Sequence, residues 1–298
     1  MLLACGSGDA RQPEPQETEL GHGWDGDRPR LMTEQNLFVA QMLLRDGALY
    51  VQELKQNAVN WPMCNLYSQT KGQAAIVSLT RAMRDTTGNL PPLPGIFPDY
   101  LAPVVRNAPD GVRELAMCRW GLPGPPQFGG APITNIRNVR SQHWRAWLKP
   151  ENRCVVPWTS FCEYADTKPK KRPTWFALDE SRPLAVFAGI WTTWHGKRGT
   201  KTNPIEGEHQ LFGFLTTGAN DVVAPIHPKA MPVILTSDRE IERWMTAPPE
   251  EALQQQRPLP DGMLKVVATG GKEDWDAEGV QHQLAELKEA IGQRELDL

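Results

Sequence analysis

Several features that mark whole classes of protein are missing from this chain of 298 residues. No stretch approaches the roughly 18 apolar residues of a membrane helix, so we expect no membrane partner. The five cysteines are odd in number and form no CxxC pair, which argues against a disulfide framework or a zinc site. Residues 2–5 superficially resemble a lipoprotein cleavage box but lack the basic region and the apolar region of about 7–15 residues of a signal peptide. We therefore predict a cytoplasmic protein without metal or cofactor.

The abundance of proline and glycine indicates a loop-rich fold that contains β-strands. The sequence has 27 prolines and 25 glycines, which disfavour a helical bundle. Hydrophobic residues make up 40% of the chain and include 11 tryptophans and 8 phenylalanines, enough for a substantial core. Globular character begins near residue 63, which leaves about 235 residues, the length of one ordinary domain.

The first 62 residues differ from the rest. Residues 1–32 have almost no apolar periodicity, as is typical of disorder, and residues 33–56 contain one predicted helix that Thr33 caps. We expect this extension to be absent from the functional protein, because translation starts at Met63 or because the segment is removed during maturation. The predicted domain then spans residues 63–298, with an acidic, helical C-terminal part over residues 237–298.

The charge is unevenly distributed. Residues 63–236 hold 20 basic and 12 acidic residues, a net charge of +8. Residues 1–62 have a net charge of −4 and residues 237–298 of −7, so the middle is basic and both ends are acidic. A basic region is what a protein that binds the phosphate backbone of nucleic acid needs, although it is also compatible with an ordinary solvated surface.

Apolar runs predict a series of short strands with few helices. Strands are predicted at 115–121, 153–157, 174–178, 184–191, 210–216 and 231–235, with extended chain over 97–105. Helices are predicted at 70–84, 238–245 and 280–296, and a proline-rich segment at 90–95 ends the first of them. This pattern favours an α+β fold: a single compact domain with a β-barrel-like mixed or antiparallel core and a few flanking helices.

The Met63-Cys64 dipeptide carries the most chemical information. If Met63 is the initiator and is removed, Cys64 has a free α-amine beside its thiol, and both groups have a usable deprotonated fraction near neutral pH. Together they attack an aldehyde twice, first forming an imine and then closing a thiazolidine ring. The alternative is a buried structural cysteine that follows a chance methionine.

Three other segments place polar residues where a plain core would exclude them. They are residues 134–138 (TNIRN), 160–164 (SFCEY) and 225–232 (PIHPKAMP). Glu163 lies in an aromatic, apolar run, which should raise its pKa and suit it to proton transfer near pH 7. A lone glutamate or histidine in such a setting is more often structural, but these segments and Cys64 together supply a nucleophile, an amide, a carboxylic acid and an imidazole.

These motifs resemble the SOS response-associated peptidase (SRAP) family. The resemblance covers roughly residues 63–236, and its motifs occur in the order of the family: Met63-Cys64, Tyr100-Leu101-Ala102-Pro103, Trp120-Gly121, Asn135-x-Arg137, Phe161-x-Glu163-Tyr164 and Ile226-His227…Met231-Pro232. The resemblance implies a protein that binds single-stranded DNA and crosslinks covalently to abasic sites through a thiazolidine on its terminal cysteine.

The resemblance also implies roles for individual residues. Cys64 would be the nucleophile, Asn135 would orient the cysteine and the sugar, Glu163 would shuttle protons, and His227 would assist acid–base steps and reversal. Arg137 would hold a phosphate. The family has an arginine where this chain has Lys229, and Ala230 is an apparent insertion, so this DNA contact differs from the family pattern.

Aromatic residues are candidates to stack on the bases that flank an abasic site. Trp120 and Phe128 border a Pro/Gly-rich loop and are the preferred candidates, because loops expose functional groups more often than strands do. Tyr164 is a further candidate. The expected partner is single-stranded DNA that contains abasic sites, and the protein is expected to be a monomer.

Two other functions fit the same residues. A Cys–His thiol peptidase or amidohydrolase would use Cys64 as nucleophile and His227 as base, with removal of residues 1–63 as its first reaction. A non-catalytic single-strand binder would use only the basic region, and its cysteine would be incidental.

Overall fold

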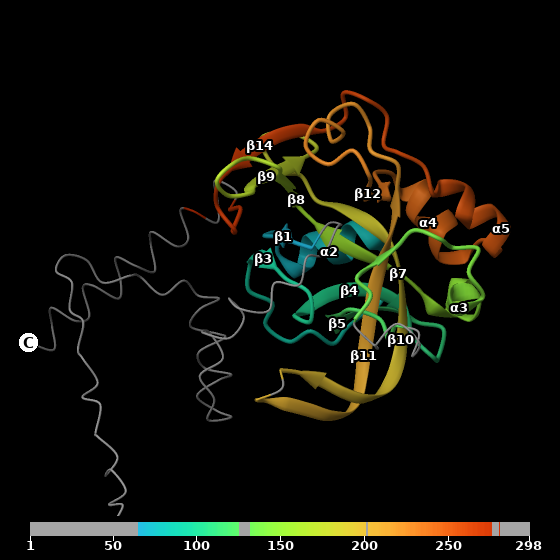
Figure 1. The fold of residues 1–298 in the computed structure, drawn as a ribbon. Helices are drawn as coiled ribbons and strands as arrows, with labels where there is room; N and C mark the ends of the chain where they lie inside the picture. Colours follow the sequence, from blue (N-terminus) through green and yellow to red (C-terminus); the bar gives the residue numbers. More distant parts are fainter. Residues whose placement is uncertain (1–64, 125–131, 201, 276–279, 281–298) are drawn as a thin grey trace, which may run out of the picture. The chain divides into compact units, whose positions relative to one another are not determined.

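Two β-sheets organise the computed structural model, which describes residues 65–124, 132–200, 202–275 and 280 (Figure 1). The five-stranded sheet has the order β14-β9-β8-β1-β3. The nine-stranded sheet has the path β12-β11-β10-β7-β4-β5-β2, with β13 on β10 and β6 on β11. The bounds are β1 (Tyr67–Gln69), β2 (Arg84–Asp85), β3 (Leu93–Ile96), β4 (Leu101–Asn107), β5 (Arg113–Trp120), β6 (Asn135–Ile136), β7 (Arg153–Trp158), β8 (Ser160–Ala165), β9 (Arg172–Ala177), β10 (Ala185–Gly199), β11 (Pro204–Thr217), β12 (Met231–Pro232), β13 (Ile234–Leu235) and β14 (Lys265–Thr269).

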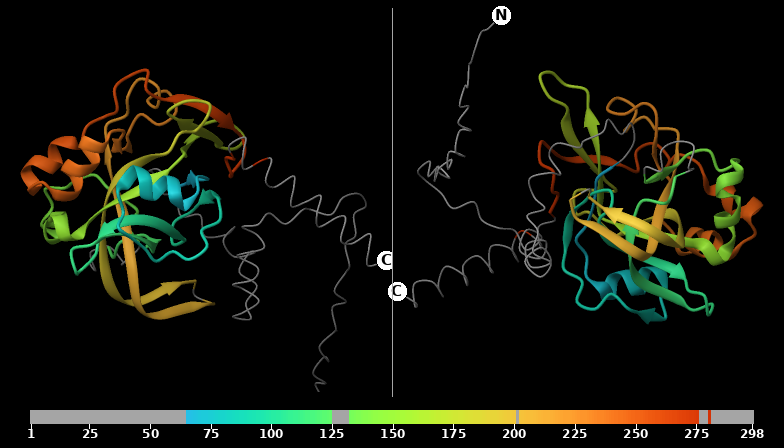
Figure 2. Two further views of the ribbon diagram at one scale, coloured as in Figure 1. Left: turned by 180° about the vertical axis from the view of Figure 1, so that it is seen from behind. Right: turned by 60° about the horizontal axis from the view of Figure 1, so that its bottom comes forward.

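Strand pairing is mostly antiparallel, with parallel exceptions at β6 and at the two ends of β5. The β10–β11 hairpin is the longest pairing, from Gly189 opposite Phe214 to Gly199 opposite Pro204. Its outer half extends beyond the sheets in the left view of Figure 2; there β10 alternates exposed with more buried residues, and β11 is exposed over residues 204–208. β11 also takes β5 and β6 as parallel neighbours, so the sheet is mixed and curls into a barrel-like core. The predicted α+β, barrel-like fold is confirmed.

The helices are few and short. They are α2 (Gln73–Thr80), α3 (Gln142–Arg145), α4 (Asp238–Thr246) and α5 (Pro249–Ala252), with 3₁₀ turns η3 (Ala146–Leu148), η4 (Pro150–Asn152) and η5 (Leu253–Gln255). Ser237 and Glu240 form a capping box at the start of α4, and the buried Arg153 donates to the carbonyls of Trp244 and Ala247 at its end. Within the described ranges, no helix is long and apolar enough to cross a membrane.

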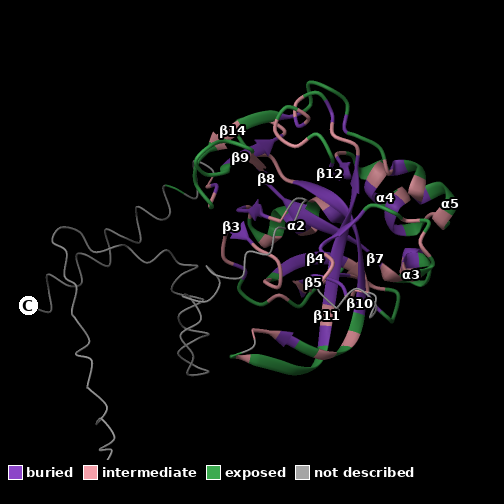
Figure 3. Ribbon diagram, viewed as in Figure 1, coloured by how far each residue is buried: buried purple, intermediate pink, exposed green. Residues whose placement is uncertain are grey.

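Aromatic rings fill the space enclosed by the strands, where Figure 3 shows buried residues. The Tyr67 ring meets the edge of Trp120 at 5.1 Å between centroids and that of Phe214 at 6.0 Å. Trp158 stacks on Phe187 at 4.9 Å. All five rings belong to the main hydrophobic cluster and are fully buried, so their burial stabilises the fold.

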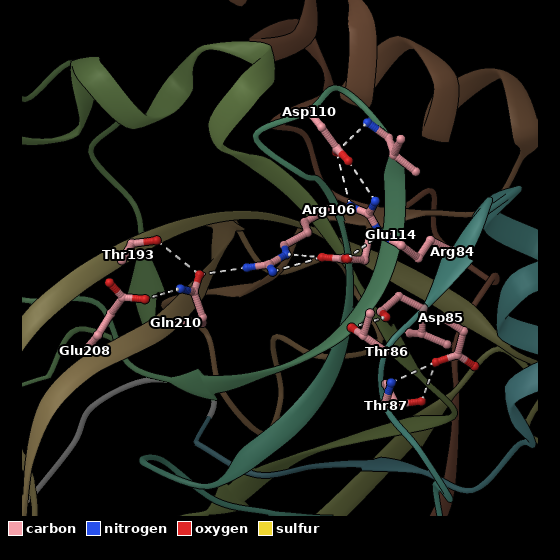
Figure 4. A network of polar contacts seen from close by, with 12 residues as sticks. Arg84, Asp85, Thr86, Thr87, Arg106, Asp110, Glu114, Thr193, Glu208 and Gln210 are labelled. Carbon is pink, nitrogen blue, oxygen red and sulfur yellow. Dashed lines mark hydrogen bonds and ion pairs between the residues drawn. The ribbon is translucent and has the colours of Figure 1, made fainter.

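A network of charged residues joins four strands on another part of the barrel (Figure 4). The buried Glu114 carboxylate accepts from Arg84 Nε at 2.6 Å and from Arg106 Nη2 at 2.9 Å. Arg84 also pairs with Asp110 at 2.7 Å, and Arg106 donates to Gln210 Oε1 at 2.7 Å. These contacts satisfy both oxygens of the Glu114 carboxylate, as a buried charge requires.

The structure corrects several predicted boundaries. The predicted 70–84 helix is limited to Gln73–Thr80, because Arg81 adopts a left-handed conformation (φ 55°) and Arg84 begins β2. Part of the 90–95 segment is strand β3, and β14 was not predicted. The predicted strands at 115–121, 153–157, 174–178, 184–191 and 210–216 and the helix at 238–245 are confirmed within a few residues, apart from the long outer half of the hairpin. The single strand predicted at 231–235 is divided into β12 and β13, which pair with β11 and β10. The helices predicted at 33–56 and, except for Val280, at 280–296 lie outside the described residues.

Candidate active site

Glu163 belongs to β8 and is buried, with a side-chain exposure of 4%. Successive side chains of a strand point to opposite faces. Phe161 packs on Phe176 in the main core, while Cys162 belongs to a small second cluster with Leu66 and Trp175. Glu163 therefore shares the inner face with Phe161, and its carboxylate lies on the core side of the five-stranded sheet.

His227 is held in a series of turns between β11 and β12. The buried Asn220 stabilises these turns, accepting from Val223 N at 3.1 Å and donating to Leu259 O at 3.1 Å. The backbone N–H of His227 donates to Val223 O at 2.8 Å. Because these bonds fix the backbone on both sides of residues 221–226, the imidazole is presented in a defined position.

The His227 ring is oriented by the carbonyl of Ala230. Nδ1 lies 3.0 Å from Ala230 O and 3.7 Å from Glu163 Oε2. A carbonyl only accepts, so Nδ1 carries a hydrogen, and in the neutral ring Nε2 is then the basic nitrogen. The structure thus brings together two of the predicted acid–base residues, which lie 64 positions apart in the sequence. The apparent insertion at Ala230 contributes the orienting carbonyl.

Asn135 lies on the neighbouring part of the nine-stranded sheet. It is buried, faces Phe214 across the parallel β6–β11 pair, and its Nδ2 donates to Thr134 Oγ1 at 2.9 Å. β11 continues from Phe214 to Thr217, opposite Met231 of β12. One strand therefore supports both Asn135 and the segment that follows His227.

Cys64 and Phe128 lie outside the described residues, but the chain immediately after Cys64 is described. Antiparallel β1 and β8 place Tyr67 opposite Phe161 and Ser68 opposite Ser160. The Cys162 N–H donates to Leu66 O at 2.9 Å. If this register continues by one residue beyond Leu66, Asn65 lies opposite Glu163. The chain therefore approaches β1 from the side of β8 that carries the buried carboxylate.

The other described cysteines are unsuited to nucleophilic attack. Cys118, Cys154 and Cys162 are buried, and none of the three is in a disulfide. Burial raises the pKa of the Cys118 thiol to about 12 and raises the pKa values of Cys154 and Cys162 well above the ordinary range. A thiol is nucleophilic only as the thiolate, so these three are inert near neutral pH.

Trp120 contradicts its prediction as an exposed stacking residue. It is the last residue of β5, as the predicted strand at 115–121 implies, but its side chain is fully buried. Its ring stacks on Phe214 at 5.2 Å, and its indole N–H donates to Thr134 O at 3.2 Å. Trp120 therefore supports the backbone that precedes Asn135, and the prediction of base stacking is wrong for this residue. Tyr164 is partly buried beside the second cluster.

Basic side chains are exposed near these elements. Arg137 follows β6, and Lys229 follows His227 by two residues; both are exposed. Gln256 Nε2 donates to Arg137 O at 2.9 Å and fixes its backbone. The β8–β9 turn, residues 166–172, is exposed throughout and contains four basic residues and one acidic residue. Among the described residues, no carboxylate forms an ion pair with Arg137, Lys229 or the three lysines of this turn.

Some residues that position the site were missed from the sequence. Asn220 and Asp274 are buried polar residues that bind segments beside His227 or Glu163. Asn220 in a Gly-Ala-Asn-Asp sequence carried a recognisable turn signal, whereas Asp274 carried none. Within the part of the chain that the structure describes, no group of three or more His, Cys, Asp or Glu residues could hold a metal ion.

The described residues form a single α+β domain whose barrel-like core holds a carboxylate–imidazole pair beside the strand that follows Cys64. A model of the SOS response associated peptidase (SRAP) family matches residues 63–270, and the chain belongs to this family. The resemblance found in the sequence motifs is thus confirmed.

Relatives and solved structures agree with this assignment. The abasic site processing protein YoqW of Bacillus subtilis (strain 168) is 31% identical over 138 residues, which cover 45% of this chain and 58% of that protein. YoaM, an abasic site processing protein of the same strain, is 29% identical over 140 residues, or 45% of this chain and 57% of YoaM. The alignments span less than two thirds of these relatives.

Crystal structures share the fold. A protein from Bordetella bronchiseptica has a TM-score of 0.53 and 24% identity, covering 70% of this chain and 98% of that one. A protein from Bacteroides thetaiotaomicron has a TM-score of 0.52 and 18% identity, covering 68% and 90%.

Proposed function

We propose that this protein processes abasic sites in single-stranded DNA by capturing them covalently through Cys64 as its first residue. The observation that carries the proposal is the contact between the buried Glu163 and the partly buried His227, whose Oε2 and Nδ1 atoms lie 3.7 Å apart, beside the strand that follows Cys64. Family membership and the relatives named abasic site processing proteins support the substrate class. An abasic sugar in its ring-opened form offers an aldehyde, the electrophile to which a 1,2-aminothiol adds.

The reaction balances without a cofactor. The Cys64 amine adds to the aldehyde carbon to give a carbinolamine, and a proton delivered to its hydroxyl lets that group leave as water, which gives an imine. The Cys64 sulfur then adds to the imine carbon, and the nitrogen takes up a proton, which closes the thiazolidine. The sum is one aldehyde and one aminothiol converted to one thiazolidine and one water.

Two groups divide the proton transfers. Glu163 is buried and close to the strand that follows Cys64, so we assign it the proton delivery in sugar opening and carbinolamine dehydration. His227 presents Nε2 as its base when neutral, since Nδ1 is bound to Ala230 O. We assign His227 the proton transfer to the departing thiolate when the adduct reverts to imine.

The remaining residues would hold DNA. Asn135 would orient the sugar and the cysteine, and the exposed Arg137 and Lys229 would contact phosphates on either side. The basic 166–172 turn continues directly from the strand that carries Glu163, so it would meet the backbone that flanks the lesion. Phe128 and Tyr164 remain the candidates for stacking on flanking bases.

The proposal requires a free amine at Cys64, so residues 1–63 must be absent from the active protein. The experiment is a denaturing gel of an abasic oligonucleotide with protein that begins at Cys64. We expect a covalent shift that Cys64→Ala abolishes, because no thiol remains to close the ring, while affinity for intact single strands persists through phosphate contacts. Cys64→Ser should give no stable adduct either, since a hydroxyl is a far weaker nucleophile than a thiolate.

Each alternative predicts a different result. Binding without any shift in the parent protein would favour a non-catalytic single-strand binder. Absence of both binding and shift, with cleavage of peptide or amide substrates that depends on Cys64, would favour a thiol peptidase. A stable crosslink in either Cys64 variant would contradict the assignment of the linking residue.

A further inference from the structure

The segment that follows β14 runs across the outer face of the five-stranded sheet. Trp175 Nε1 donates to Gly271 O at 3.0 Å, and Asp274 N donates to Pro94 O at 2.9 Å. A Cβ atom at Gly95 would lie 2.8 Å from Lys272 O, so this close approach requires a glycine in β3. Residues 271–274 therefore pack closely against β9 and β3, and Asp274 also contacts β1 and β8.

Asp274 makes the most polar contacts of the residues in the 271–274 segment. Its side chain is 3% exposed. Oδ2 accepts from Ser160 Oγ at 2.6 Å and from Arg182 Nε at 2.7 Å, while Oδ1 accepts from Arg182 Nη2 at 2.8 Å. The Asp274 carbonyl also accepts from Ser68 Oγ at 2.8 Å. A two-pronged arginine contact plus a serine gives this buried carboxylate a fixed orientation.

The two serines lie directly opposite each other in adjacent strands. Ser68 of β1 pairs with Ser160 of β8. Ser68 follows Cys64 by four residues, and Ser160 precedes Glu163 by three. Because side chains alternate along β8, Asp274 contacts the face opposite to that of Glu163. Asp274 thus binds both β1 and β8, the strands next to Cys64 and Glu163, on the face opposite to that of Glu163.

We infer that Asp274 is a positioning residue for the proposed site, fixing β1 against β8 so that the chain that follows Cys64 is held beside Glu163. The inference rests on the proposed function. The family model matches residues 63–270, so Asp274 lies outside the matched segment. A misplacement of about 1 Å in reacting groups costs on the order of 10²-fold in rate, and DNA affinity, which phosphate contacts dominate, is insensitive to it.

The test compares two isosteric changes in protein that begins at Cys64. Asp274→Asn removes the charge that holds Arg182 and Ser160. Glu114→Gln is the matched control, because Glu114 is also a buried carboxylate bound by arginine but belongs to the network of Figure 4, which includes none of the proposed site residues. The readouts are the rate of adduct formation at saturating abasic DNA and the non-covalent affinity, the latter in a Cys64→Ala background.

We expect Asp274→Asn to slow adduct formation about 10- to 100-fold with affinity within about twofold of the parent, whereas Glu114→Gln changes neither beyond about twofold. Asp274→Glu, which keeps the charge, should recover part of the rate. If Asp274→Asn does not fold, Ser160→Ala is the deciding variant: it keeps the Arg182 pair and should slow adduct formation by a smaller factor, again without loss of affinity.

The outcomes separate the two claims. A parent protein that forms no adduct contradicts the proposed function, and the role of Asp274 with it. If the parent forms adduct and Asp274→Asn changes the rate no more than Glu114→Gln does, the positioning role alone is contradicted. If Asp274→Asn does not fold, a Ser160→Ala variant that forms adduct at the parent rate contradicts the positioning role in the same way. Equal losses of rate and affinity in Asp274→Asn would assign the residue to general stability and also overturn the inference.

Discussion

Replacing Glu163 by glutamine tests the acid–base assignment with the least disturbance of packing. The side chain is 4% exposed, and the amide has nearly the same volume as the carboxyl, so the fold should be retained. A positioned acid contributes about 10²–10⁴-fold to such a step. His227 remains in Glu163→Gln, and its Nδ1 lies only 3.7 Å from the lost carboxylate. Because the imidazole can deliver protons in its place, we expect the lower end, a loss of about 10²-fold, or about 2.7 kcal/mol in the barrier.

The assay is the single-turnover rate of adduct formation at saturating abasic oligonucleotide, measured across pH about 5–8, where imidazole side chains ordinarily titrate. Affinity for the intact strand serves as the internal control and should not change, because Glu163 is not placed against phosphate. A Glu163→Gln protein that forms adduct at the parent rate throughout this range would refute the assignment. Complete loss of adduct would show that Glu163 is indispensable rather than one of two proton donors.

Three further predictions follow from the described contacts. His227→Ala should lengthen the lifetime of the adduct, measured as release into excess competitor DNA; release at the parent rate would reduce His227 to a structural role. Trp120→Phe should lower the free energy of unfolding by about 2–3 kcal/mol in urea titrations, since it loses the bond to Thr134 O and leaves a cavity, and should leave single-strand affinity unchanged; weaker binding with unchanged stability would restore a stacking role. The hydrogen bonds from Arg84 lower the pKa of Asp110 to about 2, below the ordinary value of about 3.9. A carboxyl whose pKa is lowered in the folded state stabilises the fold at pH values above its pKa in the unfolded state, and that contribution is lost as the pH falls from about 4 to about 2. Asp110→Asn should therefore make the unfolding midpoint less sensitive to pH in that window. An unchanged acid sensitivity would contradict the pairing.

The part of the fold that rests on apolar runs could be predicted from the sequence. The segments at 153–157, 184–191 and 210–216 correspond to most of β7, the first half of β10 and the second half of β11, because continuous burial on both faces requires continuous apolar sequence. The outer half of the β10–β11 hairpin could not be predicted, since most of its residues are polar, charged or glycine and form no apolar run. β14 is likewise half-exposed and follows a long irregular segment, so its pairing with β9 is visible only in three dimensions.

Part of the candidate site could also be predicted from the sequence. Glu163 and His227 stood out as polar residues in apolar surroundings, and the structure places them together. Trp120 was misjudged because proximity to a Pro/Gly-rich loop says nothing about the direction of a side chain at the end of a strand. Asp274 was missed because one aspartate in an acidic segment has no local signature; its role depends on Ser68, Ser160 and Arg182, which come from three distant parts of the chain.

The central claim is that Cys64, as a free terminal residue, links the protein to an abasic site. The most direct test is the intact mass of the protein expressed from its native gene, before and after incubation with an abasic oligonucleotide, followed by peptide mapping of the product. The account predicts a protein that begins at Cys64 and an adduct whose mass is the sum of the two partners less one water, with the oligonucleotide on Cys64. A protein that retains residues 1–62 and still forms the adduct, or an adduct on any other residue, would contradict it.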